Sequence, residues 1–302
     1  MHIRRSASGV VVQAPAKLNL FFEVLAKRDD GYHEIETLMC PIDLYDTLYF
    51  RDAPEGPVRL KCRRVFGAEG PEGRGLREVT EGPENLVVRA VELVRRRAGV
   101  NRGAEILLVK RIPAAAGLGG GSSDAAAALV AADKVWRLGR SPEELARWAG
   151  ELGSDVPFFL AGGPAVCRGR GERVTPVDGL GNLNFVLVRP PAGLATAAVY
   201  AACRAAGQPR TVRPLVEALG QGDWKQTGRR LYNRLQPAAR RLSPWVARLE
   251  REFAQLDCPG HGISGSGTSY FGVCRNTRHA RRSAGRLRAK GFDVVFAVRS
   301  CR

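Results

Sequence analysis

The sequence predicts a mixed α and β fold of about two domains. A chain of 302 residues is about twice the length of a typical domain. Hydrophobic residues make up 44% and charged residues 25% of the chain, which is ordinary for globular proteins. This composition excludes a wholly disordered chain, a collagen and a small disulfide scaffold. Segments with strand-like and helix-like patterns alternate along the chain, as is typical of folds that combine sheets and helices.

The first half of the chain is expected to place strands and helices around a glycine-rich loop. Ser141, followed by Pro142 and two glutamates, is a strong helix start, because serine caps the helix and proline fits its first turn. Residues 51–84 are rich in glycine, proline and charge and predict a surface excursion. The other expected elements are strands over 10–25 with a break at Pro15, 35–50 and 104–110, helices over 85–98 and 124–136, and a loop over 113–123.

The second half repeats this alternation after the glycines at 162–163. A second loop of glycine and serine occupies residues 262–268. The expected elements are strands over 184–189, 269–274 and 293–298 and helices over 196–205, 212–219, 244–256 and 277–290.

The charge and the cysteine content limit which classes of function are expected. The chain has 47 basic and 30 acidic residues, a net charge of +17, and 40 of the basic residues are arginine. Such a charge suggests nucleic-acid binding, but aromatic residues are only 7% and no basic-aromatic motif occurs. The seven cysteines form no C-x-x-C pair, so reduced thiols in a cytoplasmic protein are expected. Neither a signal peptide nor a membrane span is expected.

The segment Pro113–Ser123 carries the strongest functional signal. It holds four glycines within five residues between a predicted strand and a predicted helix. Glycines let a backbone approach closely, and a helix start attracts anions, so the segment predicts a phosphate site. No lysine follows the glycines, which excludes a Walker A loop, and Ser122 stands where a dinucleotide fingerprint requires glycine or alanine. The alternative is a loop that binds nothing and only reverses the chain, but such a loop would need one or two glycines rather than four.

Four segments, in order, resemble the motifs of the GHMP kinases, which include galactokinase, homoserine kinase and mevalonate kinase. The segments are Ala14–Leu20, Pro113–Ser123, Leu152–Phe159 and Ile263–Thr268. The resemblance implies an α+β fold of two domains: a mixed-sheet ATP-binding domain over 1–164 and a smaller α+β domain over 165–302, with the active site in the cleft between them. The last segment is expected to support the phosphate loop.

The resemblance implies a phosphotransferase with an alcohol acceptor that uses ATP and Mg²⁺. Side chains are not expected to hold the metal, which the ATP phosphates would carry. The expected ATP-binding residues are Pro113, Ala114, Ala115, Ala116, Gly117, Leu118, Gly119, Gly120, Gly121, Ser122 and Ser123.

Two catalytic residues follow from the same motifs. Asp155 is expected to accept the proton of the attacking hydroxyl, and Lys17 to offer a cation to the developing charge. Without the family resemblance, the sequence around Asp155 is equally typical of a residue that caps a helix. A lone lysine after a strand is commonly solvated, but the neighbours of Lys17 are apolar.

Residues Arg28–Thr37 resemble the nucleobase-recognition segment of one branch of the family. That branch phosphorylates the 2-hydroxyl of a cytidyl diphosphate methylerythritol in the non-mevalonate isoprenoid pathway. Tyr32 is expected to stack on the cytosine, His33 to read its edge and Tyr200 to cover its second face. Asn19 is expected to orient the substrate or Lys17, with a hydrogen-bonded turn residue as the alternative. A mevalonate- or homoserine-type substrate remains the closest alternative.

One segment departs from this branch. Where the branch carries Asn-Asp-Leu/Phe-Glu, the chain has Asn233-Arg234-Leu235-Gln236, so two acids are replaced. This predicts an altered local surface. Nucleic acid and membrane are not expected as partners, and a monomer or homodimer is expected.

Overall fold

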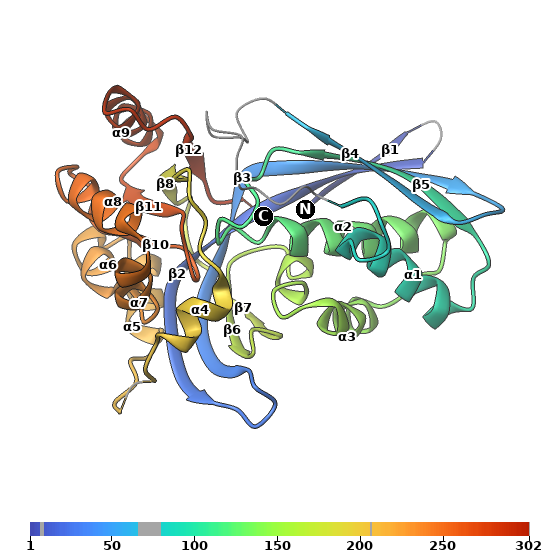
Figure 1. The fold of residues 1–302 in the computed structure, drawn as a ribbon, viewed down its shortest axis with the longest axis horizontal. Coiled ribbons are helices and arrows are strands. Elements are labelled where there is room, and N and C mark those ends of the chain that lie inside the picture. The colour runs from blue at the N-terminus through green and yellow to red at the C-terminus, as the bar shows by residue number, and fades with distance from the viewer. Residues whose placement is uncertain (7–8, 66–79, 206, 302) are drawn as a thin grey trace.

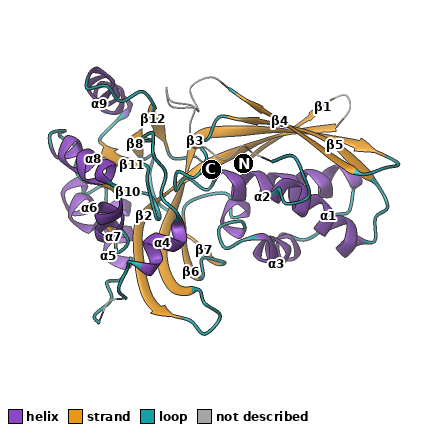
Figure 2. Ribbon diagram, in the orientation of Figure 1, coloured by secondary structure: helices purple, strands orange, loops and turns teal. Residues whose placement is uncertain are grey.

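Two β-sheets, each covered by helices, build the molecule (Figures 1 and 2). The computed structural model describes residues 1–6, 9–65, 80–205 and 207–301. The segment 66–79, within the predicted surface excursion, therefore lies outside the described residues. The predicted α+β architecture of the two-domain kinases is confirmed.

The larger sheet has eight strands and is organised by one long antiparallel hairpin. Its two strands are β2 (Gly9–Lys27) and β3 (His33–Ala53). Gly31 lies in the turn between them with φ 83°, a conformation that glycine adopts without strain. The remaining strands are β1 (His2–Ser6), β4 (Val58–Arg64), β5 (Gly103–Lys110), β6 (Ala165–Gly169), β7 (Arg173–Pro176) and β9 (Tyr232–Asn233).

Strand β2 passes through the predicted break at Pro15 without ending. The register against β3 shifts between Pro15 and Ala16 instead. A proline cannot donate to the sheet, and a bulge absorbs the missing hydrogen bond while the strand continues. The predicted domain boundary at residue 164 stays a prediction, and β6 and β7 after it pair within the larger sheet.

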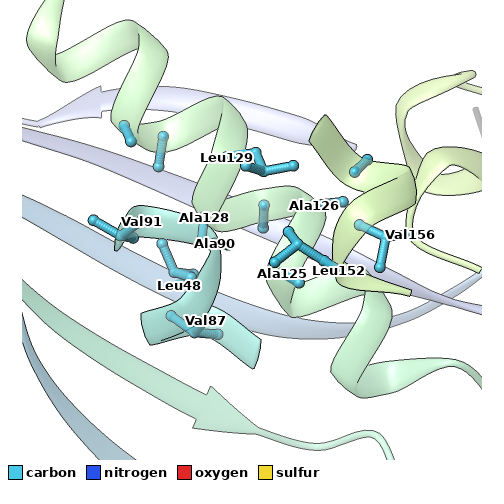
Figure 3. Packing of buried hydrophobic residues seen from close by; sticks show 14 of the residues in the cluster. Leu48, Val87, Ala90, Val91, Ala125, Ala126, Ala128, Leu129, Leu152 and Val156 are labelled. Carbon is cyan, nitrogen blue, oxygen red and sulfur yellow. The ribbon is translucent and has the colours of Figure 1, made fainter. Parts of the chain in front are cut away.

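Two helices lie against one face of the larger sheet, and a third packs on their outer side (Figure 1). They are α1 (Leu86–Ala98), α2 (Gly120–Trp136) and α3 (Pro142–Leu152). The predicted cap at Ser141 is present as a full capping box with Glu144. Figure 3 shows α2 packed between the sheet and its neighbours through alanines and Leu129. The small alanine side chains bring α2 close to the sheet, which fixes the position of its N-terminus.

Helix α2 begins four residues earlier than the sequence predicted. Gly119, with φ 70°, is its N-cap, so residues 120–123 form its first turn rather than the end of a loop. Glycine is a poor helix former. Here Gly120 is packed against Ile112, where a Cβ would lie 3.0 Å from the Ile112 side chain, so close packing decides the residue.

The smaller sheet has the order β10-β11-β8-β12 and all its pairs are antiparallel. These strands are β8 (Asn184–Val188), β10 (His261–Ile263), β11 (Tyr270–Cys274) and β12 (Val295–Arg299). The helices near this sheet are α4 (Thr196–Ala201), α5 (Arg213–Gly220), α6 (Trp224–Arg230), α7 (Gln236–Leu242), α8 (Pro244–Ala254) and α9 (Thr277–Ala289). The short 3₁₀ helix η1 (Pro157–Leu160) instead packs against α2, α3 and β7. The sequence did not predict α6, α7, β6, β7 or β9.

Strand β8 joins the two parts of the core. Phe185 and Leu187 pack with Leu18 and Ile42 of the large hairpin, and Val186 and Val188 pack toward α8 and α9. Both faces of β8 are therefore buried. Among the described residues, no helix combines the length and apolar character that crossing a membrane would require.

The core predicts a large effect for Leu129, which is fully buried in α2. Leu129→Ala should lower the free energy of unfolding by about 2–5 kcal/mol, because it removes packing and leaves a cavity. Leu242→Ala is the matched control, since Leu242 is 44% exposed. Urea unfolding followed by circular dichroism measures both, and equal losses would contradict this account of the core.

Candidate active site

Lys17 and Asp155 meet at the centre of the candidate site. Lys17 lies on β2, and its Nζ is 3.4 Å from Asp155 Oδ2. Asp155 follows α3 and lies just before η1, whose N-cap is Val156 without a side-chain bond. The side chain of Lys17 is 5% exposed and that of Asp155 is 30% exposed. Asp155 is therefore paired with a buried cation and still accessible to solvent, and it does not act as the cap of η1.

Asn19 holds the lysine in place. Lys17 Nζ donates to Asn19 Oδ1 at 2.5 Å, and Asn19 Nδ2 donates to Thr37 Oγ1 at 2.9 Å. The Asn19 backbone N–H donates to Ser264 Oγ at 3.2 Å. Asn19 is 1% exposed. The residue thus links β2 to β3 and to the second glycine-serine loop, and orients the ammonium toward Asp155.

The predicted phosphate loop, Pro113–Ser123, is held in place by close contacts that only glycines allow. A Cβ on Gly117 would lie 2.2 Å from Ser264 O, and one on Gly119 would lie 2.9 Å from Phe159 Cζ. Both glycines have positive φ, 74° and 70°. Lys17 N also donates to Leu118 O at 2.9 Å, and Ser264 Oγ donates to Gly117 O at 2.9 Å. Residues 263–268 were predicted to support this loop, and the structure shows that they do so by direct packing of Ser264 against Gly117.

A cavity of about 540 Å³ opens over this loop and the start of α2. A space of this size suits a nucleotide-sized ligand. Lys110 and Asp124 contribute polar groups to its wall. The other lining residues are Thr80, Asn85, Leu86, Leu108, Ile112 and residues 113–122, which include all but one of the predicted ATP-binding residues.

A buried ionic group that the sequence analysis missed lies beneath this cavity. Lys110 Nζ contacts both Asp46 Oδ2 and, at 2.5 Å, Asp124 Oδ2. Asp46 Oδ1 also accepts from the backbone N–H of Ile112 at 2.9 Å. Burial raises the pKa of Asp124 to about 7, although the charge of Lys110 opposes this rise. Two aspartates and one lysine carry a net charge of −1 when all are ionised, so the proton that Asp124 binds below this pKa leaves the buried group neutral.

The predicted base-binding residues separate into two places. His33 and Tyr200 are in ring contact, with centroids 4.9 Å apart and planes at 33°. Burial, and then the charge of Lys27, lower the pKa of His33. Burial, and then the charge of Asp155, raise the pKa of Tyr200. Tyr32 is 51% exposed in the turn of the hairpin, and Arg170 lies 4.8 Å from its ring centroid.

The departure at Arg234 has a structural reason. Arg234 Nε and Nη2 donate to the fully buried Glu23 at 2.7 and 3.0 Å. Burial opposes the ionisation of Glu23, but these bonds and the backbone N–H of Arg210 hold its pKa below the usual value. Gln236 accepts from the backbone N–H of Ile263 at 3.1 Å. The two altered residues, both partly exposed, thus bond to buried groups of the protein, and the expectation of an altered local surface stays a prediction.

Comparison with known proteins decides the family. Residues 85–163 match the GHMP kinases N terminal domain, and residues 215–293 match the GHMP kinases C terminal domain. The chain is 43% identical to a 4-diphosphocytidyl-2-C-methyl-D-erythritol kinase of Pelotomaculum thermopropionicum, over 95% of this chain and 96% of that protein. This chain belongs to the GHMP kinase family. It is an ATP-dependent phosphotransferase with an alcohol acceptor.

Solved structures agree with this assignment. A crystal structure of 4-(cytidine 5'-diphospho)-2C-methyl-D-erythritol kinase has a TM-score of 0.78 and 37% identity, covering 97% of this kinase and 99% of that chain. A homoserine kinase from Cytophaga hutchinsonii has a TM-score of 0.74 at 21% identity, covering 99% of this kinase and 96% of that chain. The second likeness shows the shared fold alone.

The buried ionic group predicts a pH effect on stability. A carboxyl whose pKa is raised to about 7 on folding binds its proton more tightly in the folded state. The folded state is then favoured at low pH, and this contribution is lost as the pH rises from about 4 through 7.

Asp124→Asn should therefore flatten the pH dependence of the unfolding free energy between pH 5 and pH 8. Denaturant midpoints at several pH values measure it. Asp293→Asn, at an exposed position, is the control and should keep the wild-type slope. An unchanged slope in Asp124→Asn would exclude Asp124 as the titrating group.

Proposed function

We propose that this kinase transfers the γ-phosphoryl group of ATP to the 2-hydroxyl of 4-diphosphocytidyl-2-C-methyl-D-erythritol. The observation that carries the proposal is the Lys17–Asp155 pair, 3.4 Å apart. The backbone N–H of Lys17 donates to Leu118 O of the loop to which we assign the phosphates, which supports placing the reacting pair beside that loop.

We assign ATP to the cavity over the phosphate loop. The free N–H groups at the start of α2 would hold the phosphates, aided by the positive end of a 17-residue helix. Ser122 and Ser123 would add hydroxyls to this set. The nucleoside would occupy the part of the cavity lined by Leu86, Leu108 and Lys110.

In the proposed transfer, Asp155 and Lys17 divide the work. The substrate hydroxyl oxygen forms a bond to the γ-phosphorus while the bond to the ADP oxygen breaks. Asp155 accepts the hydroxyl proton, and this acceptance can be late because the transition state is loose. Lys17 stabilises the charge on the transferred group and orients Asp155. Asn19 fixes Lys17, so its proposed role is positioning.

We propose that His33 and Tyr200 bind the cytosine. Since its pKa is lowered, the imidazole of His33 is neutral at neutral pH and offers one donor and one acceptor to a base edge. Tyr200 supplies an aromatic face beside it. Tyr32 would approach from the hairpin turn to stack on the base, where it now faces Arg170.

We propose that Mg²⁺ enters with ATP and is held mainly by its phosphates, as is usual for this ion. Ser123 Oγ fits a supporting role, because it is buried beside the loop and has no hydrogen-bond partner among the described residues. All seven cysteines are free, which fits a reducing compartment such as the cytoplasm. Each chain carries all the site residues named above, so a monomer or a homodimer would be competent.

The reaction is tested with the purified kinase and ATP. ADP release should depend on added 4-diphosphocytidyl-2-C-methyl-D-erythritol, and mevalonate and homoserine should give no more than the background rate. Mass spectrometry should show one phosphoryl group added to the cytidyl substrate. Stimulation by mevalonate or homoserine instead would reject the proposed substrate while keeping the kinase assignment.

Asp155→Asn should lower kcat by about 10²- to 10⁴-fold, the usual contribution of a general base. ATP affinity, measured by calorimetry, should stay within about threefold, because the phosphate loop is untouched. Asp178→Asn, at an exposed position, is the control and should keep full activity. A nearly active Asp155→Asn enzyme would remove the residue from the reaction.

His33→Ala should raise the KM for the cytidyl substrate roughly 5- to 150-fold, which corresponds to about 1–3 kcal/mol of base recognition. The KM for ATP should change little. His2→Ala removes an exposed histidine and is the matched control. Equal changes in both KM values for His33→Ala would argue against base reading.

A further inference from the structure

Two cysteines and a histidine come together in the second half of the molecule, away from the residues that line the ATP cavity. Cys258 lies in the segment between α8 and β10, Cys274 is the last residue of β11, and His279 lies in the first turn of α9. Neither the sequence analysis nor the proposed reaction uses these residues. Cys258 and Cys274 are 16 positions apart and His279 follows five positions later, and no C-x-x-C motif marks them.

The three side chains present their donor atoms to one another. Sγ of each cysteine and one ring nitrogen of His279 all lie within 4.8 Å of each other. Cys274 is fully buried and His279 is 6% exposed. Both thiols are free. Four ligands around Zn²⁺ are separated by about 3.3–3.8 Å, given bond lengths of about 2.0–2.3 Å. Small side-chain rotations, with shifts of about 1 Å, would therefore bring the three atoms to ligating distance.

A carboxylate completes the arrangement. Asp257 Oδ1 lies 2.8 Å from His279 Nε2, and the backbone N–H of Arg275 donates to His279 Nδ1 at 3.2 Å. Histidines that bind metals commonly donate their other ring N–H to a carboxylate, which orients the ring. Asp257 is in that position here. Metal binding through Nδ1 would replace only the long contact with Arg275.

We propose that Cys258, Cys274 and His279 form a binding site for one thiophilic divalent cation of the Zn²⁺ class. Thiolates and imidazole are the donors that such ions prefer, and three protein ligands leave a fourth position for water. Binding releases the two thiol protons to solvent, so two thiolates neutralise the charge of the ion. No oxidant or reductant is required.

The site would hold the second sheet to its helices. Cys258 precedes β10 and packs closely over Gly272 of β11. A Cβ added to Gly272 would lie only 2.9 Å from the Sγ of Cys258. Asp257 also pairs with Arg275 at 3.3 Å and with Arg282 of α9 at 3.2 Å. A bound cation would add a link between this segment, β11 and α9. The role is structural and does not depend on the proposed reaction.

The test is a Co²⁺ titration of the full-length kinase, stripped with a chelator and kept reduced with a phosphine. One Co²⁺ per chain should produce the charge-transfer absorption of a cobalt-thiolate complex and the visible bands of a four-coordinate ion. Zn²⁺ should displace it and should raise the thermal unfolding midpoint, because the ion binds the folded state. Absence of these bands in the wild-type protein overturns the proposal.

Variants then locate the site. Cys258→Ser and His279→Ala should each weaken Co²⁺ binding more than tenfold, and Asp257→Asn about 10- to 100-fold. Cys203→Ser, a thiol outside the cluster, should leave the titration unchanged. Bands that persist in Cys258→Ser overturn the proposal. A thiol count of five instead of seven after removal of the phosphine, with no Co²⁺ spectrum, identifies a disulfide pair and also overturns it.

Discussion

The close approach of three backbones around Gly117 and Lys17 determines the rest of the site. Ser264 O fills the space where Gly117 would carry a Cβ, and Lys17 N donates to Leu118 O. The predicted phosphate loop is therefore clamped between strand β2 of the larger sheet and the second glycine-serine loop. This clamp requires glycine at positive φ, because any side chain there would displace the backbone. Through Asn19 it also sets the ammonium of Lys17 against Asp155.

Buried charges are placed in two balanced groups beside this clamp. Lys110 lies between Asp46 and Asp124 beside the predicted phosphate loop. On β2, Glu23 receives four hydrogen bonds, two from Arg234 and two from backbone N–H groups. An isolated buried charge is costly, so each group persists only because its partners are present. Both groups connect β2 or β3 to distant parts of the chain, and they make the position of the long hairpin dependent on the rest of the fold.

The net charge of +17 is not explained by any one feature of the described structure. Many arginines are used in pairs with acids on neighbouring elements, as Arg102 is with Asp52 and Arg97 with Glu151. ATP and the proposed cytidyl diphosphate substrate are both polyanions, so a positive field favours their capture. Two small anions do not require a charge of this size, and most of the excess has no functional explanation here.

Sequence patterns alone predict the fold class, the family, a phosphate loop and the cap at Ser141, because these depend on glycine spacing, apolar periodicity, capping residues and the order of motifs. The sequence also predicted Lys17, Asn19 and Asp155, through motifs that lie far apart in the chain. It could not find Lys110, Asp46 or Asp124 as a group, since each is one charged residue among 77 basic and acidic ones. Only the folded structure shows which charges are buried together. It also shows that Arg234 compensates the charge of Glu23 and that Cys258 lies next to Cys274. Such pairs depend on the register of strands and the packing of helices, which bring together residues that share no local pattern.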